Sequence, residues 1–444
     1  MITMTLFFIE LKRVLRSITF WMMAVLLVVV GISQGVFPPE EGDTIKPPQP
    51  GLESYGSKAG SDPDKIMPEA LDSLYLDFRA NSYVAYPMGF YKNVHLNERE
   101  RERMAWVLSE LTGVSEAELL AAGEIEEQGR GVTIQTEDLE RNEDGSFVVQ
   151  SDGSPERPKV LENVTLAEGV SYEAFLALMQ QADRIIGGGS SYSGDYLLGS
   201  FGREPVTYEE ALADYELMLE KDRYTGAHAR LFCDYMGIFL AVLPVFPAVA
   251  LMLADKRDIR PVLYSRSVAA WKLLLCRWMA LVTATLLPLL LMGGLLTGFH
   301  CMQYSGTGVA LDLLAYFKYI LGWLLPTILV SSGMGIFLTA LTGTPAAIAL
   351  QGIWWFMDTM GNVGALTGGY RVSLAPRHNA LGRTQVFLDG FGVLVQNRVG
   401  YTLLALALFG LAVWVLGQKR RGRLEGARIA QRLLDLGPNR WRKH

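Results

Sequence analysis

The sequence predicts an α-helical membrane protein: six transmembrane helices, with an extracellular α+β domain inserted between helices 1 and 2. Half of the 444 residues are apolar and only 19% are charged, whereas about 25% of the residues of ordinary soluble domains are charged. Six stretches reach or approach the roughly 20 apolar helical residues that a bilayer core of about 30 Å requires. One long polar region separates the first stretch from the other five.

The six predicted spans follow from apolar length. They are Ile18 to Phe37, Leu231 to Ala254, Leu273 to Phe299, Leu313 to Leu341, Ala346 to Leu366 and Val399 to Leu416. A tight turn, Thr342 to Pro345, separates the fourth span from the fifth. Three glycines and Asp358 dilute the apolar character of the fifth span. Prolines within the second, third and fourth spans remove backbone hydrogen bonds and predict kinks or hinges.

The N-terminal segment FFIELKRVLRS predicts a short helix that lies in the plane of the lipid headgroups. Phe7, Phe8, Leu11, Val14 and Leu15 can share one helical face, while the basic residues fall elsewhere on the wheel. An ordinary basic flank of a first span is the alternative. The apolar run that follows is long and has no small-residue cleavage site, so we interpret residues 1–37 as an uncleaved anchor and not as a signal peptide.

The distribution of charge predicts the orientation. Residues 38–230 carry 37 acidic and 17 basic residues, and the remainder carries 23 basic and 9 acidic residues. The basic residues are concentrated before the first span, between the second and third spans, and in the tail 418–444. With six spans, these three regions lie on the same side of the membrane. Because Lys and Arg concentrate in cytoplasmic segments, this side is predicted to be the cytoplasm. Both termini are then cytoplasmic, residues 38–230 are extracellular, and residues 231–417 hold spans two to six. The basic residues flank apolar spans and form no single stripe, which argues against a nucleic-acid partner.

Local signals predict the elements of the extracellular domain. Asn97 caps a helix that ends near Gly113, and Ser115 with Glu118 forms a capping box for a second helix. The segments GVTIQ and SFVVQ predict strands joined at Asp144-Gly145. SYEAFLALMQQADRII predicts an amphipathic helix that ends at a run of glycines, and Thr207 opens a further helix. We interpret the Gly/Ser-rich stretch GGGSSYSGDYLLGSFG as a flexible loop, because it lacks the residues of a phosphate-binding loop.

Motifs for catalysis or metal binding are missing from the sequence. No lysine follows a glycine, which excludes a Walker A motif, so this chain cannot itself be a P-loop ATPase. The five histidines are scattered, and the three cysteines lie in or beside apolar segments, where they act as small hydrophobic residues. We predict no catalytic residue, no metal site and no cofactor in the chain. Asp358 is a candidate for a translocation path, because charges within spans are costly. Asp312 and Lys318 are expected to pair with each other.

The link after the second span reads ADKRDIRPVLYSRSVAAWKLLLCRWMAL, and it resembles the first cytoplasmic loop of ATP-binding-cassette permeases of the type-2 exporter class. In that family an acidic residue ends the second span, and a basic helical stretch and a turn precede the third. The matching positions here are Asp255, Lys256, Arg257, Arg260, Leu263, Tyr264 and Arg266, with re-entry at Lys272 or Arg277. Ser267 stands where the family often has proline. The overall layout is also similar, including a short helical excursion between spans five and six, within Gly369 to Arg398. The large outer domain resembles that of a Gram-positive subgroup.

The resemblance implies a permease subunit in a bacterial cell membrane, driven by ATP bound to a separate ATPase subunit. The loop 255–272 would couple the two subunits: Lys256, Arg257 and Arg260 would meet acidic residues, and Leu263 and Tyr264 would supply apolar anchors. The implied partners are this ATPase, a second permease copy or paralogue, and the lipid bilayer. A membrane-anchored sensor with an extracellular recognition domain is the main alternative, and a membrane enzyme is a third. The sequence leaves the substrate open among peptide, lipid, antibiotic and sugar.

Overall fold

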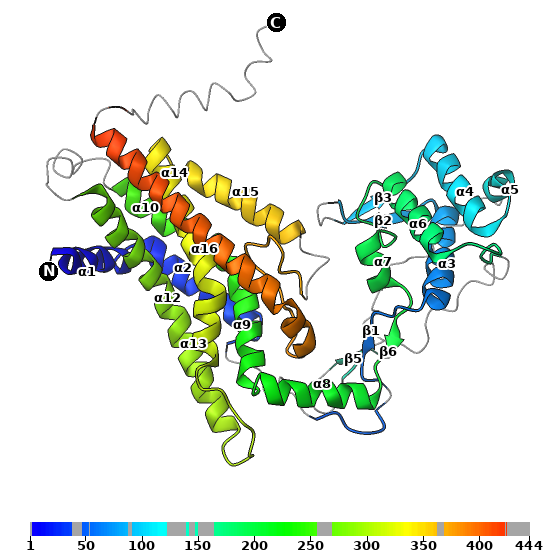
Figure 1. Ribbon diagram of the computed structural model, residues 1–444, viewed down its shortest axis with the longest axis horizontal. Coiled ribbons are helices and arrows are strands. Elements are labelled where there is room, and N and C mark those ends of the chain that lie inside the picture. The colour runs from blue at the N-terminus through cyan, green and yellow to red at the C-terminus, as the bar shows by residue number, and fades with distance from the viewer. Residues whose placement is uncertain are drawn as a thin grey trace, which may run out of the picture. The chain divides into compact units, whose positions relative to one another are not determined.

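A computed structural model of the protein describes residues 2–37, 47–52, 54–87, 91–121, 139–141, 147–149, 164–254, 269–361, 368–421 and 423. The chain divides into two compact units. The helical unit comprises Met1–Gly51 and Tyr208–His444, and the inserted unit comprises Leu52–Thr207. Figure 1 labels helices and strands of both.

The helical unit contains several long apolar helices (Figure 1). Its elements are α1 (Ile2–Leu15), α2 (Ile18–Ser33), α8 (Tyr208–Lys221), α9 (Thr225–Leu240), α10 (Val245–Ala254), α12 (Ala270–Gln303), α13 (Ala315–Tyr319), the π-helix η5 (Ile320–Leu324), α14 (Leu325–Thr342), α15 (Ala346–Gly361) and α16 (Thr384–Arg420).

Among the residues that the structure describes, three helical stretches are long and apolar enough to cross a membrane: Ala270–Gln303, Ala315–Thr342 and Thr384–Arg420. The number rises to five if each of two bent pairs, α1 with α2 and α9 with α10, forms one span. The chain is therefore a mostly helical protein with the features of a membrane protein. The predicted fifth span, Ala346 to Leu366, ends outside the described residues. Its described part is α15, which has 16 residues and is not among these candidates.

The end of the chain differs from its predicted layout. The predicted sixth span begins at Val399, whereas α16 begins at Thr384 and continues for 37 residues. The excursion expected within Gly369 to Arg398 is not a separate helix. Residues 368–383 have no helical turn, and the rest of that range belongs to α16.

The N-terminal segment forms a helix of its own. Helix α1 meets α2 at 66°, and Ser17 caps α2 by accepting a hydrogen bond from the Phe20 amide. The packed face of α1 differs from the predicted one at two positions. Phe8 is 58% exposed, while Glu10 is buried beside Val14.

Two of the expected proline effects are present. Helices α9 and α10 are bent by 42° across the break that contains Pro244. The π-helix η5 ends immediately before Leu325 and Pro326. By contrast, α12 continues through Pro288. Proline therefore interrupts the regular α-helix in two of the three predicted spans that contain it.

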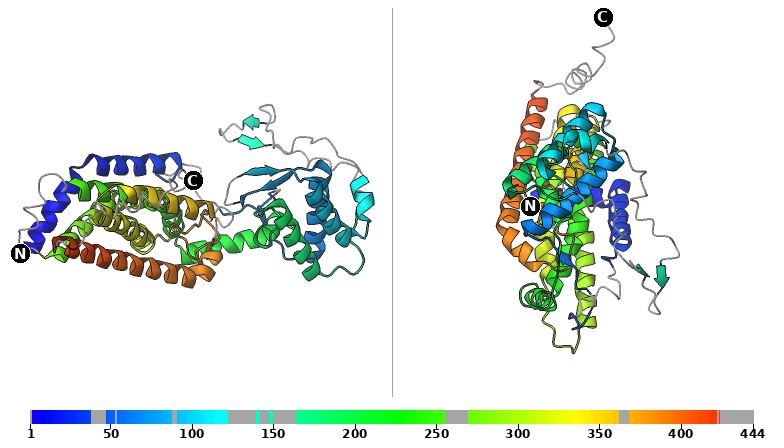
Figure 2. Two further views of the ribbon diagram at one scale, coloured as in Figure 1. Left: turned by 90° about the horizontal axis from the view of Figure 1, so that it is seen from above. Right: turned by 90° about the vertical axis from the view of Figure 1, so that its right-hand side faces the viewer.

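The core of the helical unit is apolar and draws on α2, α9, α10, α12, α14 and α16. Helix α14 packs against α16, α10 and α15, and α1 packs against α12. Helices α2 and α16 lie on opposite flanks of the unit, with other helices between them (Figure 2). As expected, Cys233, Cys276 and Cys301 lie within helices as free thiols.

The inserted unit combines short helices with small antiparallel ladders. Its helices are α3 (Pro63–Ala80), α4 (Glu98–Thr112), α5 (Glu116–Ala121), α6 (Tyr172–Ile186) and α7 (Gly194–Ser200). Its strands are β1 (Ser57–Lys58), β2 (Tyr83–Ala85), β3 (Lys92–Val94), β4 (Leu139–Arg141), β5 (Phe147–Val149) and β6 (Glu204–Pro205), which pair as β1–β6, β2–β3 and β4–β5. Helices α3, α4, α6 and α7 supply most of the core.

The helix boundaries of the inserted unit agree with the local signals. Asn97 and Glu100 form a reciprocal capping box at the start of α4, and Gly113 ends that helix in the left-handed conformation. Ser171 caps α6, which ends at Gly187. SFVVQ contains β5, whereas GVTIQ lies outside the described residues.

The Gly/Ser-rich stretch is more ordered than expected. It contains α7, and Ser190 within it is 1% exposed. The Ser190 amide and hydroxyl both donate hydrogen bonds to Asp183, at 2.8 and 2.7 Å. The Tyr192 hydroxyl donates to Asp77 at 2.6 Å. Buried carboxylates from α6 and α3 therefore fix this stretch, a contact that the local sequence does not reveal.

Candidate functional site

The predicted site residues fall on different parts of the chain. Asp255, Lys256, Arg257, Arg260, Leu263, Tyr264 and Arg266 lie outside the described residues. Asp358 lies in α15, and the re-entry candidates Lys272 and Arg277 lie in α12. The polar groups that the structure brings together are instead arranged around residues 368–383, the connection between α15 and α16.

One side of this connection is held by α9. Asp234 in α9 is fully buried and accepts two hydrogen bonds from Nε of Arg377, at 3.0 and 3.1 Å. It also accepts a hydrogen bond from the His378 amide at 2.5 Å. A carboxylate buried among apolar helices needs such partners, because an unpaired buried charge is strongly unfavourable.

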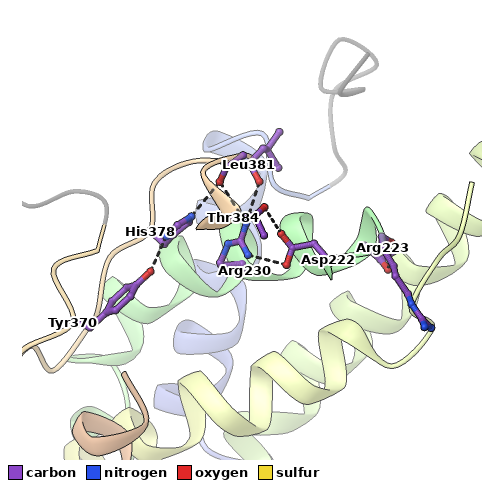
Figure 3. A network of polar contacts seen from close by, with 9 residues as sticks. Asp222, Arg223, Arg230, Tyr370, His378, Leu381 and Thr384 are labelled. Atoms are coloured by element: carbon purple, nitrogen blue, oxygen red, sulfur yellow. Dashed lines mark hydrogen bonds and ion pairs between the residues drawn. The ribbon is translucent and has the colours of Figure 1, made fainter. Parts of the chain in front are cut away.

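A second ion pair connects α8, α9 and α16. Arg230 is fully buried, and its Nη1 lies 2.9 Å from Oδ1 of Asp222. Its Nη2 donates to the Leu381 carbonyl oxygen at 3.2 Å, and the Thr384 hydroxyl donates to Asp222 at 2.7 Å. Arg230 thus lies between Asp222 and the end of the connection (Figure 3).

His378 and Tyr370 form a polar contact within the connection. The Tyr370 hydroxyl lies 2.7 Å from Nδ1 of His378, and both residues are fully buried (Figure 3). Burial, aided by the positive charge of Arg230, lowers the pKa of His378 to about 4. The histidine is therefore neutral near pH 7 and adds no second positive charge beside Arg230.

Asp358 binds the connection from α15. Its carboxylate accepts hydrogen bonds from the Ser373 hydroxyl at 3.2 Å, the Leu374 amide at 2.9 Å and the Ala375 amide at 3.2 Å. Its observed partners are therefore groups of the protein itself. A role in a translocation path remains a prediction.

Helix α16 completes the arrangement with Asn397 and Arg398. Asn397 donates hydrogen bonds to the Tyr370 and Ser373 carbonyl oxygens, at 2.7 and 3.0 Å. The buried guanidinium of Arg398 donates to the Trp323 and Ser373 carbonyl oxygens, at 3.0 and 2.9 Å. These contacts join the connection to η5 and α16.

We call this set the loop clamp: residues 368–383 together with Asp222, Arg230, Asp234, Asp358, Asn397 and Arg398. Strained backbone borders it. Arg223, Tyr224, Val372 and Arg383 have φ values of 46–60°, which is unusual for residues other than glycine. Such conformations persist only where surrounding contacts over-determine them, and they cluster at functional sites. The clamp supplies such contacts on both sides of the connection.

A groove adjoins the clamp between η5, α14 and α16. It has a volume of about 700 Å³, and both Asp222 and Arg398 line it. Most of its other lining residues are apolar. Pockets of about 300–1,000 Å³ with a few polar groups are typical ligand sites.

A separate buried ion pair lies between α1 and α12. Nε of Arg277 lies 3.1 Å from Oε1 of Glu10, and their side chains are 4% and 6% exposed. Nη1 of Arg277 also contacts the Met252 sulfur of α10 at 4.0 Å. Arg277, expected only as a basic flank or re-entry residue, therefore joins α1 to the two helices that border residues 255–268.

Sequence reasoning missed most of the clamp. Its strongest available signal was Asp234, an acidic residue inside the predicted span Leu231 to Ala254, where a charge predicts a buried partner. Arg230 is the last residue of the predicted extracellular region 38–230, since the predicted second span begins at Leu231. Nothing local identifies Arg377 as the partner of Asp234, or Asn397 and Arg398 as donors to the connection, since the groups that they bind are distant in the chain. The expected Asp312–Lys318 pair is present, at 2.6 Å.

Comparison with known proteins does not assign the chain to a family. Family models, curated proteins and solved structures all gave no match to the chain. Among the described residues, no group of three or more His, Cys, Asp and Glu side chains could hold a metal ion.

Proposed function

We propose that the chain is the permease subunit of an ATP-binding-cassette transporter. It moves a substrate across or out of the membrane with ATP hydrolysed by a separate ATPase subunit. In this proposal six spans cross a bacterial cell membrane, and the inserted unit is extracellular. Both termini are cytoplasmic, and a second permease copy or paralogue completes the transporter.

The Arg277 contact carries this proposal. A force applied by an ATPase to residues 255–268 reaches α10 before the loop and α12 after it. Arg277 touches Met252 in the last turns of α10 and pairs with Glu10 in α1. A loop displacement would therefore move three helices together, as coupling between an ATPase and a permease requires. Breaks and a π-helix within the apolar stretches provide places where helices can bend.

In the test, the full chain is solubilised in detergent from the membranes of the cells that naturally produce it, and is affinity-purified. The co-purified proteins are identified by mass spectrometry and assayed for ATPase activity. The coupling variant combines Lys256→Glu, Arg257→Glu and Arg260→Glu. The control combines Arg440→Glu, Arg442→Glu and Lys443→Glu, the same charge change in the tail. We expect the wild type and the control to retain an ATP-binding-cassette ATPase, and the coupling variant to lose it while still inserting in the membrane.

Two results would contradict the proposal at different levels. Recovery of as much ATPase with the coupling variant as with the wild type would contradict the coupling role of residues 255–268. Absence of any nucleotide-hydrolysing partner from the wild type would remove the permease function. Tight ligand binding by the chain would then favour the sensor alternative.

A further inference from the structure

The groove beside the loop clamp has two apolar walls. One wall is formed by η5 and the start of α14, including Leu321, Leu325 and Leu329. The other wall is formed by α16, including Val395, Val399 and Leu403. Val399 and Leu403 are 54% and 61% exposed, so the groove is continuous with the outer apolar surface of α16.

One end of the groove is charged. Lys221, Asp222, Asp312 and Lys318 line it there, and Thr225 joins the two sides by donating a hydrogen bond to the Asp312 carbonyl oxygen at 2.9 Å. The acidic groups at this end are engaged by the protein. Asp222 binds Arg230 and Thr384, and Asp312 binds Lys318 and the Leu314 amide.

The pKa of Asp312 agrees with this arrangement. Burial alone would raise the pKa of this carboxyl group, but the hydrogen bonds from Lys318 and the Leu314 amide outweigh burial, and the pKa is lowered. Asp312 therefore stays ionised and holds the Lys318 ammonium group at this end of the groove. The side chains of Lys221 and Lys318 are 48% and 60% exposed, and their ammonium groups lie 2.6 Å from carboxylate oxygens of Glu220 and Asp312, respectively. Both ammonium groups therefore face outward at this end of the groove while also being ion-paired.

The dimensions of the groove fit one hydrocarbon chain. At a rise of about 1.5 Å per residue, the wall from Lys318 to Leu329 is about 17 Å long. The hydrocarbon part of one membrane leaflet is about 15 Å thick. A chain lying along this wall would thus begin at the lysines and end near the middle of the bilayer.

We propose that this groove binds one acyl chain of a membrane phospholipid, and that Lys221 and Lys318 bind its phosphate. Lysine side chains at the ends of membrane helices commonly extend toward the headgroup level. The π-helix η5 forms part of the groove wall. Gly322 within it lines the groove, and a Cβ atom at this position would meet no atom within 4 Å. This site does not depend on an ATPase partner, so it can be tested separately from the permease function.

The first test fills the apolar part of the groove. Full-length protein in detergent is incubated with dioleoylphosphatidylglycerol, and bound lipid is counted by native mass spectrometry. Gly322→Leu places a side chain in the groove. Gly294→Leu is the control, because Gly294 in α12 is also exposed, has equally open space and does not line the groove. We expect Gly322→Leu to lower lipid retention about tenfold and Gly294→Leu to leave it unchanged.

The second test concerns the phosphate. Dioleoylglycerol carries the same chains without the phosphate, so the ratio of the two retained lipids measures phosphate recognition. The double variant Lys221→Gln with Lys318→Gln should lower this ratio about tenfold. Lys65→Gln is the control, because Lys65 is 53% exposed and ion-paired but lies in the inserted unit.

Three outcomes would overturn the proposal. Equal phospholipid retention by Gly322→Leu and Gly294→Leu would show that the groove does not hold the chain. An unchanged lipid ratio in the lysine double variant would remove the phosphate site. Conversion of a dimer to a monomer by Gly322→Leu, with unchanged lipid retention, would identify the groove as an interface between copies.

Discussion

The helical unit and the inserted unit place their charged groups differently. In the helical unit, several charged groups are buried and paired with partners far along the chain, such as Arg377 with Asp234 and Arg277 with Glu10. In the inserted unit, helices start at local caps such as Asn97, and ion pairs such as Lys65 with Glu204 are partly exposed. The first unit therefore depends on buried ion pairs between distant residues, whereas the second depends on helix caps, on buried hydrogen bonds such as that of Tyr192 to Asp77, and on an apolar core.

The largest effect is expected from Arg230→Met, because it leaves Asp222 buried with only the Thr384 hydroxyl and neighbouring dipoles. Removing one partner of a buried ion pair typically costs about 3–5 kcal/mol. The measurement is thermal unfolding of the purified chain in detergent. Arg223→Met is the control, because Arg223 is exposed, and it should change stability by less than about 0.5 kcal/mol. Equal effects of the two variants would contradict the importance of the buried pair.

The next largest effect is a loss of stability in acid through His378. Its pKa is about 4 in the folded protein, below its ordinary value of 6.5, so the unfolded chain binds a proton more readily. The stability that neutral His378 contributes to the folded protein is therefore fully present above pH 6.5. It is lost as the pH falls toward 4, by up to about 3 kcal/mol. Unfolding of the wild type and His378→Gln is compared at several pH values. The charged neighbours Arg230, Arg383 and Asp234 are common to both proteins, and parallel pH profiles would exclude His378 as the source.

A smaller effect is expected at the cap of α4. Asn97→Ala removes the hydrogen bond to the Glu100 amide and should destabilise the helix by about 1 kcal/mol. Hydrogen exchange of the full chain should be faster in residues 98–104 and unchanged in α12. Equally faster hydrogen exchange in both units would show that their stabilities are coupled. It would contradict the view that the two units are stabilised by different interactions.

The smallest effect is expected from Lys65→Met. Lys65 lies 3.3 Å from Glu204 and is 53% exposed, and exposed ion pairs contribute about 0–1 kcal/mol. Thermal unfolding should shift by less than for Asn97→Ala. A shift as large as that of Arg230→Met would erase the distinction between buried and exposed pairs.

Local information explains which features the sequence could predict. The caps at Asn97 and Ser171, the glycines that end α4 and α6, and the long apolar helices all follow from neighbouring residues. The connection between α15 and α16 has no such signal, because Asp234, Asp358 and Arg398 reach it from three helices. The start of α16 was missed for a related reason: its first four turns are less apolar than a span, so hydropathy marks only its second half.

The unbroken length of α16 has a mechanical consequence. At about 1.5 Å per residue its 37 residues extend about 55 Å, well beyond a hydrocarbon core of about 30 Å. Thr384 is bonded to Asp222 at one end, and at the other Lys419 donates a hydrogen bond to the Leu341 carbonyl oxygen at 3.0 Å. Both ends of this long helix are thus hydrogen-bonded to other parts of the helical unit. A tilt of α16 by about 5° about one end would displace the other end by about 5 Å.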